Sequence, residues 1–111
     1  MSFLNHNQIE DYNNKGYVSP INIFSKQEAK EIREEIEKIE KKWPEALTGL
    51  NRNYVHLISP VFDKICHNSK ILDAVESLIG KNILICGTTL FIKNPNEKGF
   101  VSFHQDAKYI G

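Results

Sequence analysis

The 111-residue sequence has few of the features that mark several large classes of protein. It has no net charge and only two arginines, Arg33 and Arg52, so a basic surface for nucleic acid is not expected. No apolar run reaches the ~18 residues that span a bilayer, and the N-terminal residues lack the basic and apolar regions of a signal peptide. We therefore expect a soluble, cytoplasmic protein that binds neither nucleic acid nor membrane.

Cysteine is also scarce. The two cysteines, Cys66 and Cys86, are too few for a disulfide framework, and both lie among apolar neighbours in the sequence. We expect them to be buried free thiols, as in the reducing environment of the cytoplasm.

What is present is the composition of an ordinary globular protein, with 41% hydrophobic and 25% charged residues. The length suits a single unit over residues 1–111, since domains typically contain ~100–150 residues. The sequence contains no repeat and no Gly/Ser-rich linker. We therefore treat residues 1–111 as one unit.

Two capping-box patterns predict helices in the first half of the sequence. Asn5 with Gln8 predicts a helix that stops at Gly16, and Ser25 with Glu28 predicts a longer one that ends before Pro44. The second helix carries an apolar stripe, made up of Ala29, Ile32, Ile36, Ile39 and Trp43. We expect this stripe to pack on the protein's own core, and the alternative is a face that binds a partner.

Two further helices are predicted before residue 80. One covers residues 61–66, and the other covers residues 70–79, with Ser69 as its cap and Gly80 as its end. Residues 1–80 are thus expected to be mainly helical.

The pattern changes after residue 80. Residues 82–93 and 100–106 are rich in β-branched and aromatic residues, and the segment between them, residues 94–99, is a cluster of turn formers. We therefore predict strands within residues 81–111 and an α+β fold class.

The strongest candidate for chemistry is the sequence His104-Gln105-Asp106. In a strand, His104 and Asp106 project to the same face, so the imidazole and the carboxylate can converge on one point. An imidazole and a carboxylate are two of the three ligands in the facial triad of non-haem Fe(II) oxygenases. The simpler interpretation is a histidine at a strand end that is hydrogen-bonded to a nearby aspartate.

The order of motifs along the chain resembles one oxygenase family. The motifs are Gln8-Ile9-Glu10, Lys15-Gly16-Tyr17-Val18, His56-Leu57, the predicted helix up to Gly80, Leu90-Phe91-Ile92-Lys93-Asn94-Pro95 and Phe103-His104-Gln105-Asp106. Together they are similar to the phytanoyl-CoA dioxygenase family of Fe(II)/2-oxoglutarate-dependent oxygenases. The resemblance covers nearly the whole chain. It implies helices followed by the first strands of a double-stranded β-helix, or jelly-roll, core.

The resemblance also implies a site and a reaction. His104 and Asp106 would be metal ligands for Fe(II), and Lys93 would lie near the cosubstrate 2-oxoglutarate; the alternative for Lys93 is a solvated lysine at a strand end. Thr89 and Phe91 alternate with Lys93 on one face of the predicted strand, where they either line the same pocket or take part in ordinary sheet packing. The reaction implied is hydroxylation of a small organic or acyl substrate, coupled to decarboxylation of 2-oxoglutarate to succinate. The carboxylate of Asp106 indicates a hydroxylase rather than a halogenase, in which that carboxylate is replaced.

Two residues of the family pattern, a distal histidine ligand and an arginine for 2-oxoglutarate, have no counterpart among these 111 residues. We therefore expect the N-terminal portion of an oxygenase domain, with little or no turnover by itself and with strand edges open to self-association. The alternative from another functional class is a small helical protein-interaction domain without catalysis. A complete site assembled by oligomerisation would need His6, His56 or His67 from another copy. We expect His6 to be exposed, His56 to be partly buried and hydrogen-bonded, and His67 to lie at a helix end.

Overall fold

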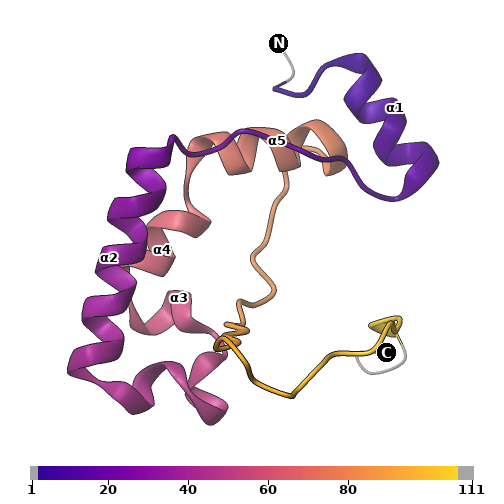
Figure 1. Ribbon diagram of the computed structural model, residues 1–111. Coiled ribbons are helices and arrows are strands. Elements are labelled where there is room, and N and C mark those ends of the chain that lie inside the picture. The colour runs from indigo at the N-terminus through magenta and orange to yellow at the C-terminus, as the bar shows by residue number, and fades with distance from the viewer. Residues whose placement is uncertain (1–2, 108–111) are drawn as a thin grey trace.

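The computed structural model describes residues 3–107, which form helices joined by turns and extended segments (Figure 1). The elements in chain order are α1 (His6–Lys15), α2 (Lys26–Lys42), the 3-10 helices η1 (Pro44–Leu47) and η2 (Gly49–Arg52), α3 (Val55–Ile58), α4 (Pro60–Cys66) and α5 (Ser69–Ile79). Within the described range, none of the helices is long and apolar enough to cross a bilayer.

Both predicted capping boxes are confirmed. The Asn5 side chain accepts a hydrogen bond from the Gln8 amide, and the Gln8 side chain accepts one from the Asn5 amide. Ser25 and Glu28 form the same reciprocal pair at the start of α2. These bonds satisfy amide groups in the first turn that have no partner inside the helix. Gly16 ends α1 in the left-handed conformation, at φ 80°, which glycine adopts without steric cost.

The predicted cap of α5 was wrong by one residue. Asn68 is the cap, and its side-chain oxygen accepts hydrogen bonds from the amides of Lys70 and Ile71 at 3.0 and 3.3 Å. Ser69 is instead the first residue of the helix. Both residue types favour this position, so the sequence pattern could not decide between neighbours. Gly80 ends the helix as predicted.

The core lies where α2 packs on α4 and where α3 meets α4. Its buried residues are Leu47, Val55, Val61 and Phe62. Ile32, Ile36 and Ile39 of α2 pack against this cluster. For the middle of the stripe, this confirms the prediction that it packs on the protein's own core. The ends of the stripe, Ala29 and Trp43, are exposed. The middle of the stripe is therefore occupied by the protein's own core and is not a free partner-binding face.

After α5 the chain returns to the other end of the helical layer. Residues 80–90 run as an irregular coil from the end of α5 to the region of η2 and α3 (Figure 1). There the Leu90 amide donates to the Arg52 carbonyl oxygen at 3.0 Å, and the Tyr54 amide donates to the Thr88 carbonyl oxygen at 2.6 Å. Asn53 and Thr89 form an isolated antiparallel β-bridge between these two segments. We call this contact between residues 52–56 and 87–91 the junction.

The predicted strands, and with them the α+β jelly-roll class, were wrong. Over residues 3–107 the structure contains no strand, and the bridge at Asn53 and Thr89 is its one β-type pairing. β-Propensity describes how well a residue fits a paired sheet, and it supplies no pairing partner. Residues 82–93 and 100–106 therefore form no ladder and, apart from the bridge at Thr89 and the turn at Asp106, have no regular secondary structure. The last part of the predicted strand region, residues 108–111, lies outside the described residues.

The molecule is more open than a typical protein of its size. Its radius of gyration is 16.2 Å, whereas a compact domain of this length has a radius of about 13 Å. Beyond the junction, residues 92–107 run away from the helices (Figure 1). Large apolar side chains are exposed on the segment that follows α5, namely Leu84, Phe91, Ile92, Phe100, Val101 and Phe103. This segment thus presents apolar surface to solvent.

Candidate metal centre

His104 and Asp106 converge at the far end of the extended segment. The Nε2 atom of His104 lies 3.1 Å from the Oδ1 atom of Asp106. Residues 101–105 have no regular secondary structure and Asp106 begins a turn, so the two side chains meet without the support of a sheet. The predicted convergence of the two groups is confirmed, and their role as metal ligands stays a prediction.

The backbone orients the imidazole of His104. Its Nδ1 atom lies 2.8 Å from the carbonyl oxygen of Ser102. Because a carbonyl oxygen only accepts hydrogen bonds, Nδ1 carries the proton and Nε2 is the atom presented to Asp106. The bond to Ser102, followed by the hydrogen bond and charge of Asp106, raises the pKa of His104 above its ordinary value. The site therefore favours a positive charge at the imidazole.

The pair is open to solvent. The side chain of His104 is 39% exposed and that of Asp106 is 76% exposed. Over residues 3–107, no group of three histidine, cysteine, aspartate or glutamate side chains is placed to hold a metal ion. The described part of the chain thus supplies two converging ligand groups and not a third.

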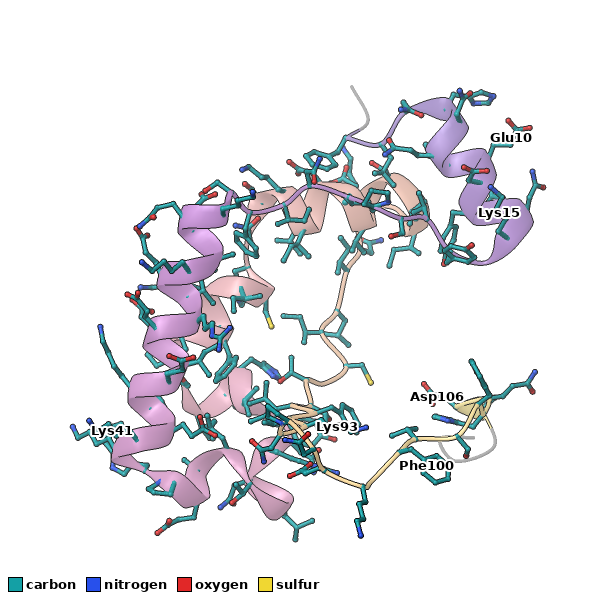
Figure 2. All side chains as sticks on the ribbon, in the orientation of Figure 1. Glu10, Lys15, Lys41, Lys93, Phe100 and Asp106 are labelled. Atoms are coloured by element: carbon teal, nitrogen blue, oxygen red, sulfur yellow. The ribbon has the colours of Figure 1, made fainter. Side chains whose placement is uncertain are left out.

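The predicted cosubstrate residues lie elsewhere. Thr89 belongs to the junction, where its hydroxyl donates to Asn53 Oδ1 at 3.0 Å. The guanidinium of Arg52 lies over the ring of Phe91, at 5.2 Å from its centroid. Lys93 follows the junction, and Figure 2 shows it well separated from Asp106, with Phe100 between them along the chain. The structure therefore does not bring Lys93, Thr89 and Phe91 together with His104 and Asp106.

The sequence did not predict the contacts of the junction. His56 Nδ1 lies 2.7 Å from the hydroxyl of Thr88, and Tyr54 adopts the left-handed conformation at φ 56°. A Cβ atom at Gly87 would come within 3.2 Å of the Tyr54 ring, so the glycine permits this close approach. The turn formers Gly49, Asn51 and Asn53 indicate a turn in this part of the chain. No local pattern indicates that Asn53 pairs with Thr89, which lies 36 residues further along.

The remaining histidines are placed as predicted. His6 is exposed in the first turn of α1, and His56 is half-buried and hydrogen-bonded to Thr88. His67 ends α4, where its Nδ1 atom lies 3.0 Å from the carbonyl oxygen of Asp63. The same Nδ1 atom lies 3.1 Å from Oδ1 of Asp63, which makes a second His–Asp pair in the molecule. Both thiols are free as predicted, but neither is fully buried, because Cys66 is partly buried and Cys86 is exposed.

Comparisons with known proteins identify the family of the chain. No curated protein and no solved structure matches the chain. A family model, described as phytanoyl-CoA dioxygenase, matches residues 12–110. The matched range includes the junction and the His104–Asp106 pair. Since the match extends over most of the sequence, the chain belongs to the phytanoyl-CoA dioxygenase family.

Proposed function

We propose that this chain carries part of the active site of a non-haem Fe(II)/2-oxoglutarate-dependent dioxygenase. The observation that carries the proposal is the convergence of His104 and Asp106 at 3.1 Å within the range that matches the family. The substrate class proposed is a small organic or acyl molecule, and the location proposed is the cytoplasm. Nucleic acid and membrane are not among the proposed partners.

The donor set fits a divalent cation. Since Nδ1 of His104 donates to Ser102, a neutral imidazole turns the lone pair of Nε2 toward a carboxylate oxygen, and two acceptors then face each other. A proton or a cation resolves that conflict. His104 and Asp106 would be the residues that hold such a cation, through Nε2 and Oδ1.

In the proposed mechanism, His104 and Asp106 hold the metal. The Ser102 carbonyl fixes the imidazole ring by accepting from Nδ1, as the outer partners of metal-bound histidines commonly do. Fe(II) with 2-oxoglutarate supplies the activation of dioxygen, with release of succinate and carbon dioxide. Lys93, Thr89 and Phe91 have no part in this mechanism, because the structure does not bring them together with His104 and Asp106 (Figure 2).

The proposal has a direct test in anaerobic Fe(II) titration of the chain. We expect weak binding that is lost in His104→Ala and in Asp106→Ala, because two protein ligands hold the ion only loosely. His67→Ala is the matched control, since His67 and Asp63 form another exposed pair at the same 3.1 Å separation. Equal binding by His104→Ala and the unmodified chain would contradict the proposal.

Turnover gives a second measurement. We expect little or no succinate release by these 111 residues, because no third metal ligand stands beside the pair over residues 3–107. Rapid 2-oxoglutarate turnover by the same chain would refute the proposal that the site needs further ligands.

A further inference from the structure

A strap of chain lies on α5, at the opposite end of the molecule from the junction. The strap consists of residues 3–23, which include α1 and the segment that leads from Gly16 across α5 toward the start of α2 (Figure 1). α1 contains no buried residue. Leu4, which is 2% exposed, is the one buried side chain of the strap. The burial that holds the strap is therefore concentrated at a single residue.

Two hydrogen bonds attach the strap to α5. The Leu4 amide donates to Ser77 Oγ at 3.3 Å, and the Lys70 ammonium donates to the Ile23 carbonyl oxygen at 3.1 Å. Lys70, Ala74 and Ser77 are four and three residues apart, so they lie on one face of the helix. Ala74 is buried but does not belong to the cluster of the core. The strap thus lies on the α5 face that has Ala74 at its centre.

The neighbouring helices do not need the strap for their own ends. α2 starts with the reciprocal pair of Ser25 and Glu28, and Asn68 caps α5. The buried cluster of the core and the apolar residues packed against it all come from residues 32–90. Removal of the strap from α5 therefore leaves both caps and the core in place.

We propose that residues 3–23 open and close on α5 as one unit while α2, α3 and α4 stay folded, so that the strap controls access to the α5 face around Ala74. Leu4 is the main attachment, because its burial removes apolar surface from water. Once Leu4 leaves α5, α1 is a separate helix of 10 residues, and a helix of this length is marginal in water. α1 therefore loses its helical hydrogen bonds when the strap opens. The proposal is independent of iron and of 2-oxoglutarate.

Hydrogen–deuterium exchange of the full chain tests the proposal, with mass spectrometry of peptides from α1, α2 and α4. We expect Leu4→Ala to speed exchange in α1 at least ~10-fold, as for loss of a buried leucine side chain, and to leave α2 and α4 unchanged. Lys70→Met removes the other attachment, which is at Ile23 and outside α1. Because the strap opens as one unit, this variant should also speed exchange in α1, by roughly 2- to 10-fold.

Matched controls are available for both variants. Leu50→Ala changes a leucine that is 88% exposed, and Lys81→Met changes an exposed lysine that follows α5, so both should leave exchange in α1 as it is. The proposal is overturned if either Leu4→Ala or Lys70→Met leaves exchange in α1 unchanged. It is also overturned if α2 and α4 are accelerated as much as α1, or if α1 shows no protection in the unmodified chain.

Discussion

The half-buried imidazole of His56 and the hydroxyl of Thr88 lie 2.7 Å apart, and this bond joins α3 to the segment that follows α5. The same hydroxyl accepts from the His56 amide at 3.4 Å. Thr88→Val keeps the shape of the side chain but removes both interactions. Because His56 then loses a partner in a half-buried place, we expect a loss of about 1 kcal/mol in the free energy of unfolding, measured with urea.

Thr89→Val is the control for this prediction. Its hydroxyl bonds to Asn53 on the exposed side of the junction, where water can replace it. We expect a smaller loss than for Thr88→Val. If Thr89→Val proves the more damaging change, the importance assigned to the buried side of the junction is wrong.

The second prediction concerns two serines at helix starts. Ser25→Ala removes the hydroxyl that accepts from the Glu28 amide, so we expect it to cost about 1 kcal/mol of unfolding free energy. Ser59 also precedes a helix, but its hydroxyl makes no capping bond and is buried without a partner. We therefore expect Ser59→Ala to be neutral or stabilising. Thermal unfolding of the two variants distinguishes these outcomes, and equal destabilisation would contradict the prediction.

The third prediction is a dependence on pH. The pKa of Glu28 is lowered from 4.5, mainly by the hydrogen bond from the Ser25 amide and then by that from the Ser25 hydroxyl. A lowered pKa in the folded state means that the ionised form is favoured by folding. Its contribution to stability is present above the pKa of the unfolded state and is lost as the pH falls through the folded pKa.

Glu28→Gln tests this prediction, because it keeps an oxygen that can accept the capping bond but removes the charge. We expect the loss of stability between about pH 5 and pH 3 to be smaller in this variant. Unfolding by urea at a series of pH values provides the measurement.

The fourth prediction compares the two thiols. Burial and then the Asp63 carboxylate raise the pKa of Cys66, whereas Cys86 is exposed. Since the thiolate is the reactive form, we expect iodoacetamide to label Cys86 faster than Cys66 in the folded protein. Peptide mass spectrometry at successive times measures both rates. Labelling in urea is the control and should bring the two rates together, and faster labelling of Cys66 in the folded protein would contradict the prediction.

The fifth prediction follows from the apolar extended segment. Phe100 and Phe103 are largely or fully exposed, on backbone that has no strand partner over residues 3–107. We propose that this segment drives self-association. In sedimentation experiments, the double variant Phe100→Ser/Phe103→Ser should associate less. Leu50→Ser/Leu57→Ser, which changes exposed residues of η2 and α3, should associate as the unmodified chain does.

The helices could be predicted from the sequence because their signals are local. A cap and its partner are three residues apart, as in Ser25 and Glu28, so both ends of the interaction lie in one short window. The apolar stripe on α2 can also be recognised locally, because its residues are three or four positions apart. The cap of α5 shows the limit, since adjacent Asn68 and Ser69 carry the same local signal.

The strands could not be predicted in the same way. The β-branched and aromatic residues of 82–93 indicate a strand, but a sheet also needs a second segment in register, and the structure supplies only the bridge at Thr89. The same reasoning applies to the candidate site. The spacing of His104 and Asp106 predicted their convergence, whereas the separation of Lys93 from Asp106 depends on the path of the whole segment (Figure 2).

The junction also has a consequence for the order of folding. The bridge between Asn53 and Thr89 closes a loop of chain that contains α3, α4 and α5. The entropy lost on closing such a loop is smaller once helices have shortened the flexible chain between its ends. Helix formation in α3–α5 should therefore precede closure of the junction.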